Sequence, residues 1–401
     1  MQSTKLFHSQ VIALVVLLAV LYLALAHGIY TALTQRVLGA NDFYSRWVGA
    51  RVLFLRGENP YSDAVTREIQ IGMYGRLARP DEDQVAFAYP LYTAFAVAPL
   101  VALPYAQAQA LWMTLLIFTA TGGVLILARL DRIALKPSMF VALLLGALMY
   151  YPSVRGIFLG QFALVSFFCC VLALAAIQTS RDGFAGILLA LATVKPQPVV
   201  FLAPALVLWA VCQRRWRIVG GAVGAWLALV VLALALAPTW ILDFVRAIHK
   251  YAEYEPVGPP VQTLFELLLP KAWTLDVPLT LAVSAGLVGW MVWRVIASRR
   301  ATWDDFQPIV NMIAIVTTLT AGRVGTPDQM LLLIPWLHWL SEWLRRGQRV
   351  RAALGALAIL LLPWVVFFAT LRGDTEHVVV TLVLPFLTLA VYGGWQMTDG
   401  R

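Results

Sequence analysis

The charged residues of one short stretch could act on a substrate that carries a phosphate. The stretch is GANDFYSRWVGARVLFLRGENPYSD, residues 39–63, and its first acidic residue is Asp42. We expect a helix to start at Asp42, where the helix dipole favours an ionised carboxylate, as a general base must be. Arg46 lies one turn further on nearly the same face, whereas Arg51 faces another way. A carboxylate beside guanidinium groups suits a substrate with a phosphate and a hydroxyl to be activated.

For the two strongest candidates the sequence leaves a structural alternative open. Asp42 could be only a helix-start residue paired with Arg46. Lys195 interrupts the apolar segment LALATVKPQPVVF, where a charge is unfavourable and normally faces a cavity or a partner. Two prolines break the helix beside it, because proline lacks the backbone donor that a helix interior needs. Lys195 is therefore either a phosphate ligand or one half of a structural ion pair.

A short loop near the end of the chain holds further polar candidates. It reads AGRVGTPDQ, residues 321–329, and contains Arg323, Asp328 and Gln329. The histidines are scattered and form no H-E-x-x-H or comparable zinc pattern. The densest acidic run, DED at 81–83, is expected to be a solvated lead-in to the next apolar segment. We therefore expect no metal and no other cofactor.

The elements that must position these residues are transmembrane helices. Of the 401 residues, 61% are hydrophobic and 13% are charged, against about 25% charged in a soluble domain. A spanning helix needs roughly 20 apolar residues, and backbone groups in lipid need internal partners. About twelve segments qualify, with cores at 11–32, 87–103, 107–128, 138–153, 161–179, 184–212, 217–237, 275–297, 307–321, 330–344, 352–371 and 377–396.

The net charge of +9 is explained by topology and does not indicate nucleic acid. Most arginines sit in short loops beside helix ends, where they mark the cytoplasmic side. With a cytoplasmic N-terminus, twelve helices place the basic groups near 214–217, 299–300 and 345–351 inside. The basic loop 129–136 would then lie outside, as an exception. We expect the first segment to remain as a spanning helix.

Two long loops fall on the outer face, at 33–86 and 238–274. In the first, a helix of about 15 residues should run from Asp42 to Gly57, and a second amphipathic helix should occupy 64–78. The first helix is too short and too charged to span the membrane. Its apolar side chains would lie on the membrane surface as an interfacial helix; they are Trp47, Val48, Leu53, Phe54 and Leu55.

Several motifs, taken in order, resemble glycosyltransferase family 87. The stretch NDFYSRWVGARVLFLRGENPY resembles the D-F…A-A-R…G-x-x-P-Y signature of that family. The stretch FAYPLYTAFAVAPLVALP is similar to its Y-P-P segment, which would open the second helix. The region from GQFALVSFF through KPQPVVF to RRWR looks like its G-Q…A-G…K-P…R-R-W block. The resemblance covers roughly residues 35 to 335.

The resemblance implies an all-α polytopic membrane protein with the C-type glycosyltransferase (GT-C) fold, as one domain over residues 1–401. Members of the family transfer a sugar, often mannose, from a polyprenyl-phosphate carrier at the outer leaflet. The chain would then be a multi-pass protein of the plasma membrane with its site on the outer face. Its partners would be a polyprenyl-phosphate sugar donor, a membrane lipid or glycan acceptor and the bilayer, with no nucleic acid.

The resemblance also implies roles for residues. The catalytic aspartate of the family matches Asp42 by position, so Asp42 would deprotonate the acceptor hydroxyl in an inverting, metal-independent transfer. The donor phosphate would be held by Arg51, Lys195, Arg46 and Arg323. Contacts to the sugar or the acceptor would come from Tyr44, Tyr61, Tyr89, Gln161, Asp328 and Gln329.

The chain departs from the family pattern at two places. Arg46 stands where the family commonly has an aromatic residue, and Asp328 and Gln329 stand where members often show S-W-x-H-H. The main alternative function is a transporter or flippase of lipid-linked sugars, which would use the same basic groove without chemistry. The large first loop with its aspartate, and the absence of paired sequence halves, favour the enzyme.

Overall fold

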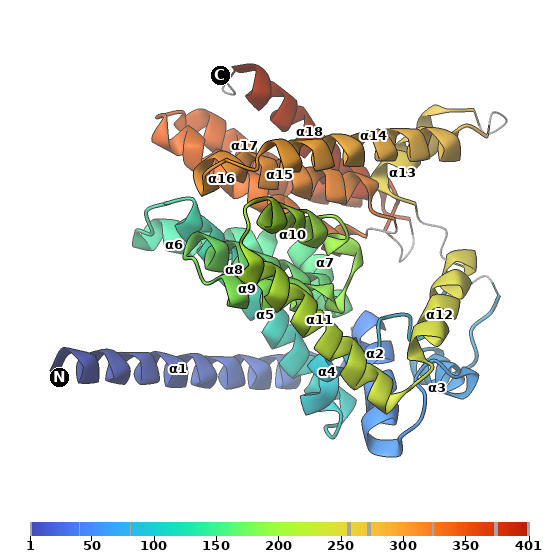
Figure 1. The fold of residues 1–401 in the computed structure, drawn as a ribbon. Helices are drawn as coiled ribbons and strands as arrows, with labels where there is room; N and C mark the ends of the chain where they lie inside the picture. The colour runs from blue at the N-terminus through green and yellow to red at the C-terminus, as the bar shows by residue number, and fades with distance from the viewer. Residues whose placement is uncertain are drawn as a thin grey trace.

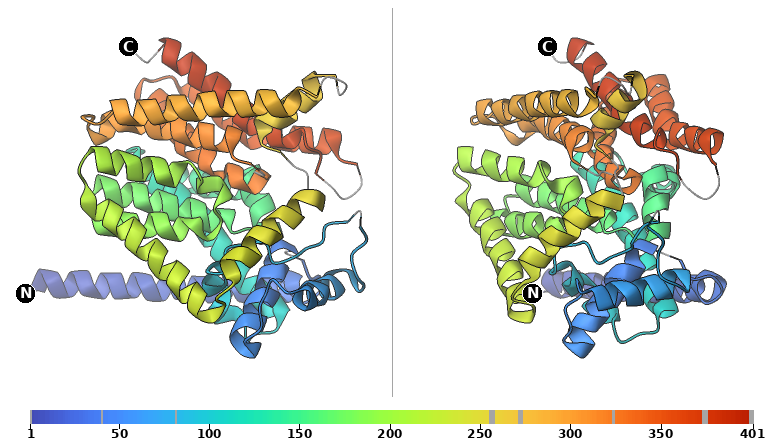
Figure 2. Two further views of the ribbon diagram at one scale, coloured as in Figure 1. Left: turned by 45° about the vertical axis from the view of Figure 1, so that its right-hand side comes forward. Right: turned by 90° about the vertical axis from the view of Figure 1, so that its right-hand side faces the viewer.

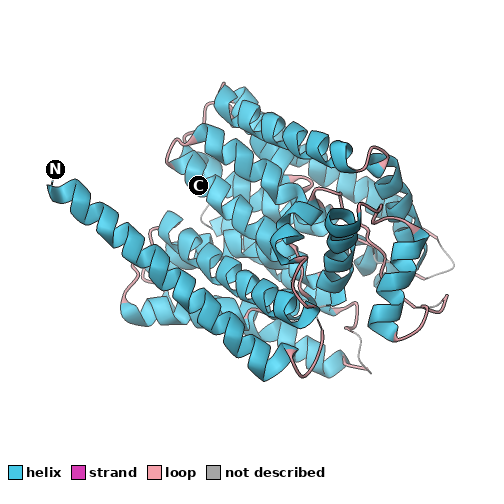
Figure 3. Ribbon diagram, turned by 90° about the horizontal axis from the view of Figure 1, so that it is seen from below, coloured by secondary structure: helices cyan, strands magenta, loops and turns pink. Residues whose placement is uncertain are grey.

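The structure is a computed structural model that describes residues 2–39, 41–80, 82–254, 258–270, 274–322, 325–372 and 376–398. Every secondary-structure element of these residues is a helix, which confirms the all-α prediction (Figure 3). The α-helices are α1 (Gln2–Ile29), α2 (Asn41–Arg56), α3 (Asp63–Tyr74), α4 (Thr93–Val97), α5 (Tyr105–Leu130), α6 (Pro137–Met149), α7 (Tyr151–Leu159), α8 (Ala163–Gln178), α9 (Asp182–Leu191), α10 (Leu202–Cys212), α11 (Trp216–Leu236), α12 (Trp240–Tyr254), α13 (Pro260–Leu268), α14 (Asp276–Ala297), α15 (Trp303–Thr320), α16 (Leu333–Arg345), α17 (Arg349–Thr370) and α18 (Val380–Thr398). Short segments join them: the π-helical η1 (Tyr30–Thr34) and the 3₁₀ turns η2 (Ala98–Leu100), η3 (Ala192–Val194), η4 (Gln197–Val199) and η6 (Thr326–Leu332).

Among the described residues, five helices are long and apolar enough to cross a membrane: α1, α5, α11, α14 and α17. The bent pair α6 and α7, which meet at 57°, would form a sixth span. Shorter apolar helices are also present, among them α8 and α18. The chain is thus a membrane protein, as the composition predicts, but the described helices do not confirm the predicted count of twelve spans.

The arginine-rich loops lie at one end of the helix bundle, which we call the basic end. Arg132, after α5, pairs with Asp304 at the start of α15 at 3.4 Å. Gln213, after α10, donates a hydrogen bond to the carbonyl oxygen of Ala301 at 2.9 Å. The opposite end, which we call the site end, carries α2, α3 and α12. Figure 1 shows the N-terminus at the left and these three helices at the right.

The segment 87–103 does not form a spanning helix, so that prediction is wrong. It contains only the five residues of α4 and the three residues of η2. Prolines interrupt this apolar stretch repeatedly, and each removes a backbone donor that a continuous helix needs. With this span gone, α5 runs from the site end to the basic end. The loop 129–136 therefore joins the other basic loops, as the Arg132–Asp304 pair shows, and the predicted exception is also wrong.

The segment 184–212 is broken rather than continuous. The helix α9 starts near the basic end, where Asp182 pairs with Arg215, and α10 returns there to end at Cys212. Between them Lys195 has extended backbone dihedrals, φ −125° and ψ 103°. A residue before proline avoids the helical region, so Pro196 forces this break. The break reverses the direction of the chain. Lys195 therefore lies at the turn between α9 and α10, away from the basic end.

The two predicted helices of the first loop are present. The first, α2, ends before Gly57, whose φ of +68° is the left-handed conformation that glycine adopts most easily. The second, α3, is capped at its start by the Ser62 hydroxyl, which accepts from the Val65 amide at 3.3 Å. It ends at Tyr74, four residues earlier than predicted, and is capped by Gly75 with φ +69°.

The prediction that the apolar side of α2 faces the membrane surface is wrong. Trp47, Val48 and Leu53 are all less than 10% exposed, and they pack inside the protein. Leu55 is exposed. The apolar face of α2 is covered by α4 and α5 instead of lipid, because burial against protein removes the same apolar surface from water. This docking holds the start of α2 rigidly against the bundle.

Candidate functional site

Side chains from five separate parts of the chain, Asp42 among them, meet at the site end. The Gln161 amide Nε2 donates to Asp42 Oδ2 at 2.6 Å. Lys195 Nζ donates to Gln161 Oε1 at 2.7 Å and forms an ion pair with Asp328 Oδ1 at 2.6 Å. Tyr89 also donates from its hydroxyl to Gln161 Oε1, at 3.3 Å. We call Asp42, Gln161, Lys195, Asp328 and Tyr89 the Asp42 network.

The network fixes which way the Gln161 amide points. An amide oxygen only accepts and an amide nitrogen only donates. Lys195 and the Tyr89 hydroxyl both contact the oxygen, so the nitrogen must face Asp42. The nitrogen then donates to one carboxylate oxygen, Oδ2, whereas the other, Oδ1, lies 3.7 Å from Arg46 Nη1. The Asp42 side chain is 30% exposed, so a substrate can reach it.

Arg46 supplies a buried positive charge beside Asp42. Its Nη1 lies 3.7 Å from Asp42 Oδ1 and donates to the Asp42 backbone oxygen at 2.8 Å. Its guanidinium lies over the Tyr89 ring, 4.1 Å from the centroid. Burial by itself lowers the pKa of Arg46, but the facing Tyr89, Asp42 and Tyr251 groups more than offset this, so the pKa is raised. Arg46 therefore remains a cation in this site.

One tryptophan positions both halves of the Asp42–Gln161 contact. The ring of Phe43, next to Asp42, stacks on Trp112 of α5 with centroids 4.9 Å apart. The Trp112 indole donates to the carbonyl oxygen of Gly160 at 2.9 Å, directly before Gln161. Gly160 ends α7 with φ +72°, a conformation that turns the chain so that Gln161 leaves the helix. A buried aromatic contact thus sets the distance between the two polar side chains.

The entry to α2 is also fixed by α5. The Tyr105 hydroxyl donates to the carbonyl oxygen of Gly39 at 2.6 Å, and the Gly39 amide donates to Gln109 Oε1 at 3.3 Å. These bonds hold the chain three residues before Asp42. Buried polar backbone groups need such partners, and here they also fix the position of the first turn of α2.

The structure places several predicted site residues away from the Asp42 network. Arg51 donates to the carbonyl oxygen of Val101 and lies over the Trp47 ring, so it faces another way, as its spacing predicts. Gln329 is fully buried and donates to the carbonyl oxygen of Thr381 at 2.7 Å. Tyr44 packs edge-on against Tyr105. These side chains already have protein partners in this arrangement.

Two further predicted residues have different relations to the network. Tyr61 supports it indirectly, because its hydroxyl donates to the backbone oxygen of Tyr89. Arg323 lies outside the described residues. Its position relative to the donor phosphate therefore stays a prediction.

Sequence reasoning missed a second carboxylate near Asp42. Asp83 is exposed at the surface, as the predicted solvated lead-in implies. Desolvation by the surrounding protein nevertheless raises the pKa of its carboxyl, and the charge of Asp42 raises it further, whereas a hydrogen bond from the Val85 amide and the charge of Arg46 lower it. Nothing in the local sequence relates Asp83 to Asp42.

A second polar cluster lies beside the same loop as Asp328. Glu376 accepts from the Tyr151 hydroxyl at 2.8 Å and from the Thr326 hydroxyl at 3.0 Å, and it pairs with Arg155 at 3.4 Å. These contacts hold the start of η6, which carries Asp328, against α7, which precedes Gln161. No local sequence pattern predicts this cluster, since its members come from three distant segments.

Comparison with known families decides the class of protein. A model described as glycosyltransferase family 87 matches residues 87–319, more than half of the chain. The chain belongs to glycosyltransferase family 87. It is therefore a membrane glycosyltransferase, which acts on a sugar donor and an acceptor at a lipid bilayer. Searches of curated proteins and of solved structures found no match.

The range matched to glycosyltransferase family 87 holds part of the Asp42 network. Tyr89, Gln161 and Lys195 fall inside it, whereas Asp42 and Asp328 fall outside. The assignment of Asp42 therefore rests on the local motif and on the contacts described above.

The described part of this glycosyltransferase contains no group of three or more His, Cys, Asp or Glu side chains that could hold a metal ion. Asp81 lies outside the described residues. Glu82 is engaged by Arg76 at 2.6 Å, and the Arg76 and Arg79 bonds lower the pKa of Glu82 to about 2. That the transfer reaction needs no metal ion stays a prediction.

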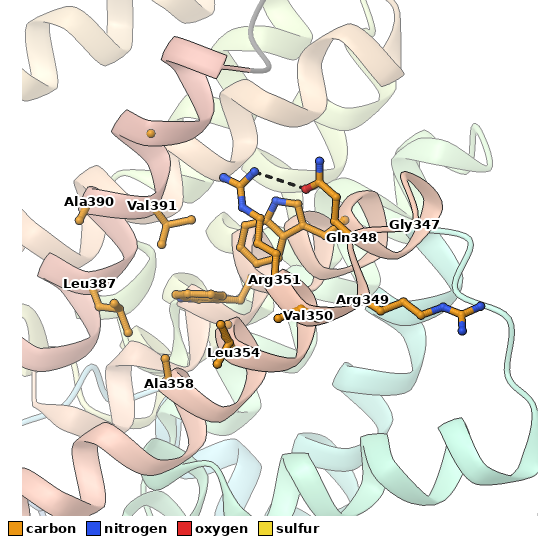
Figure 4. Close-up of a pocket in the computed structure, with 14 residues that line it drawn as sticks. Gly347, Gln348, Arg349, Val350, Arg351, Leu354, Ala358, Leu387, Ala390 and Val391 are labelled. Carbon is orange, nitrogen blue, oxygen red and sulfur yellow. Dashed lines mark hydrogen bonds between the residues drawn. The ribbon is translucent and has the colours of Figure 1, made fainter.

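A large apolar groove of this glycosyltransferase lies away from the Asp42 network. It has a volume of about 820 Å³ and runs between α17 and α18 at the basic end. Figure 4 shows Leu354, Leu387 and Val391 along it, with Arg351 hydrogen-bonded to Gln348 at one side. It shares no residue with the network. We therefore do not assign it to the transfer chemistry.

Proposed function

We propose that this chain transfers a sugar, with mannose as the first choice, from a polyprenyl-phosphate donor to a lipid or glycan acceptor. The Asp42–Gln161 contact is the observation that carries the proposal. It fixes one oxygen of a carboxylate whose side chain is 30% exposed and whose other oxygen lies 3.7 Å from Arg46. A general base needs this combination of orientation and access.

In the proposed reaction Asp42 Oδ1 takes the proton of the acceptor hydroxyl. The acceptor oxygen attacks C1 of the donor sugar from the face opposite the phosphate, and a new glycosidic bond forms. The bond between C1 and the phosphate oxygen breaks, and polyprenyl phosphate leaves with the bonding electron pair. The configuration at C1 is inverted, and the proton remains on Asp42 until it passes to water.

The leaving phosphate needs positive charge close to the reacting carbon. Arg46 fits this role, because its buried Nε has no hydrogen-bond partner among the described residues. Lys195 is a second candidate, and its ammonium group has three donors, of which Gln161 and Asp328 account for two. Arg323 is retained as a third candidate on sequence grounds. Arg51 is left out of the mechanism, because it is bound to Val101.

Besides the proposed contact to the phosphate, Lys195 has a positioning role, which its ion pair with Asp328 supports. Both side chains are nearly fully buried, with 6% and 1% exposure. Lys195 holds the oxygen of the Gln161 amide and so aims its nitrogen at Asp42. The two alternatives for Lys195 that the sequence leaves open can therefore coexist in one residue.

The proposal places the site on the outer face of the plasma membrane. The basic loops mark the cytoplasmic side by the positive-inside rule, and the Asp42 network lies at the opposite end. The corrected course of 87–136 brings every basic loop named above to one end, which removes the exception to this rule. A donor on the outer leaflet would reach the network from that side.

The deciding assay uses purified protein in lipid nanodiscs with labelled polyprenyl-phosphate mannose. We expect release of polyprenyl phosphate together with label transferred to a lipid extract of the source membrane. A flippase would instead move the intact donor between leaflets of a proteoliposome without cleaving it. Translocation without cleavage would overturn the proposal.

A further inference from the structure

A polar cleft lies between the first loop and α12 at the site end. Its volume is about 300 Å³, and most of the side chains that line it are polar. One wall comes from residues 59–66 and 84–87, and the other comes from Asp243, Arg246, Ala247 and Lys250 of α12. Figure 2 shows α12 beside the α2–α3 segment at this end.

Hydrogen bonds hold the two walls of the cleft together. Asn59 Nδ2 donates to Asp243 Oδ2 at 2.8 Å, and the Thr239 hydroxyl donates to the same oxygen at 2.7 Å. Asn59 also accepts from the Tyr61 amide through its Oδ1 at 3.0 Å. One asparagine thus connects α12 to the turn that carries Tyr61. The cleft depends on the tertiary fold, because Asn59 and Asp243, which join its walls, are 184 residues apart in the chain.

The first-loop wall of the cleft continues into the Asp42 site. Tyr61 lines the cleft and donates from its hydroxyl to the backbone oxygen of Tyr89. Gln84 lines it too, and the next residue back is Asp83, whose carboxyl feels the charges of Asp42 and Arg46.

On the α12 side, Lys250 lines the cleft and is followed by Tyr251, whose charge acts on the pKa of Arg46. The hydrogen bond between Tyr61 and Tyr89 therefore joins the cleft directly to the reaction centre. A ligand seated in the cleft would reach toward Asp42.

The charges of the cleft indicate what it binds. Arg246 faces Asp243 at 3.2 Å, and Lys250 faces Asp63 at 3.8 Å. Each of these cations has a carboxylate partner, so the cleft offers no surplus positive charge for a phosphate. It offers many donors and acceptors, which suit the hydroxyl groups of an uncharged sugar.

We propose that this cleft is the acceptor site and binds the glycan part of the acceptor. This inference rests on the proposed function and adds where the acceptor lies and which residues select it. Asn59, Asp243 and Gln84 would bind sugar hydroxyls and hold the reacting hydroxyl toward Asp42. The donor phosphate would lie beside Arg46, outside the cleft.

The test fills the cleft without touching the Asp42 network. Ala247→Trp places a large side chain in the cleft from α12, and Thr66→Trp does so from the opposite wall. Val245→Trp is the matched control, because Val245 is 46% exposed on another face of the same helix. The probes are free disaccharides of mannose, glucose and galactose, together with the octyl glycosides of the same sugars. Binding is followed by saturation-transfer NMR on the full-length protein in nanodiscs.

We expect at least one sugar probe to bind the unmodified protein, and both cleft-filling variants to bind it at least tenfold more weakly. Val245→Trp should bind like the unmodified protein. If octyl glycosides bind and free disaccharides do not, the protein recognises the acceptor glycan together with its lipid. Equal binding of both kinds of probe indicates that the protein recognises the sugar alone. Either pattern supports the cleft. Unchanged binding in both filled variants, or no binding of any probe by the unmodified protein, would overturn it.

Release of polyprenyl phosphate from the donor is measured in the same samples. Hydrolysis of the donor without acceptor should be equal in Val245→Trp and the unmodified protein, because this substitution lies outside the cleft and leaves Asp42 and Arg46 in place. Sugar binding without any donor cleavage would refute the proposed function and leave the cleft standing. Donor cleavage with sugar binding that is insensitive to both filled variants would refute only the cleft.

Discussion

Gln161 and Asp42 are 119 residues apart in the chain, and the amide of one donates to the carboxylate of the other at 2.6 Å. The contact exists because Trp112 stacks on Phe43 and also binds the carbonyl of Gly160. Lys195 and Tyr89 then fix the amide so that its nitrogen faces the carboxylate. Hydrogen bonds thus connect Asp42 as the base, Gln161 as the group that orients it, and Lys195 as the charge that holds Gln161.

Asp42→Asn should abolish transfer and leave donor binding nearly intact. The amide fills the same space and cannot take a proton, so we expect a loss of about 10²–10⁴-fold in kcat. The measurement is transfer rate alongside direct donor binding in nanodiscs. An Asp42→Asn protein with more than a tenth of normal activity would show that Asp42 is not the base.

Gln161→Met should lower kcat while both KM values stay nearly constant. Methionine keeps the length and removes the bonds to Asp42 and Lys195, which should cost on the order of 1–3 kcal/mol in the transition state, roughly tenfold to a hundredfold in rate. Steady-state kinetics with each substrate varied in turn would check this. A rise in KM for the donor with unchanged kcat would instead assign Gln161 to donor binding.

Lys195→Met should destabilise the protein by about 3–5 kcal/mol, because it leaves Asp328 buried without its partner. Lys195→Met combined with Asp328→Leu removes both charges and should restore the melting temperature and the yield. The donor KM of this double variant then separates the two roles of Lys195. A raised donor KM in a stable double variant identifies a phosphate ligand, whereas a normal donor KM identifies a positioning residue only.

Excess EDTA should leave transfer unchanged, and added Mg²⁺ or Mn²⁺ should not raise it. A polyprenyl-phosphate donor carries one phosphate, so arginine and lysine side chains can balance its charge without a divalent cation. The assay is transfer in EDTA, followed by addition of each metal. Activity that disappears with EDTA and returns with metal would contradict the cationic mechanism, and Asp42, Asp81, Glu82 and Asp83 would be the ligands to test.

The contact between α12 and the first loop should weaken in acid. Although partial burial raises the pKa of Asp243, bonds from Thr239 and Asn59 and the nearby Arg246 lower it more, so the pKa is below its usual 3.8. A carboxyl with a lowered pKa in the folded state adds stability above its unfolded pKa, and this stability is lost as pH falls through the folded value. We therefore expect α12 to loosen only below about pH 3.8.

Pepsin cleavage within α12 is the readout for this loosening, since pepsin works in this pH range. Asp243→Asn is the matched control, because its side chain does not titrate. The ratio of the two cleavage rates should approach one as pH falls, and the variant should be cut faster at the upper end of the range. A constant ratio across the range would show that Asp243 does not hold α12.

The sequence by itself determined the class of protein and the local elements of the site. Long apolar segments have to be helices in lipid, because no water is present to satisfy the backbone. The position of Asp42 in the first turn of α2, the stop at Gly57 and the opposite facing of Arg51 all follow from local spacing on a helix. The break at Lys195 follows from the two prolines after it, as the sequence predicts.

The tertiary structure alone decided which polar residues meet. Gln161, Lys195 and Asp328 lie on separate elements, and no local pattern relates their positions to Asp42. The apolar face of α2 could equally cover lipid or protein, and only packing against α4 and α5 settled that it is buried. The hydrophobic effect is non-directional, so the sequence pattern predicts which face of α2 is buried but not whether lipid or protein covers it. For the same reason, the cleft between the first loop and α12 became visible only when Asn59 and Asp243 were brought together.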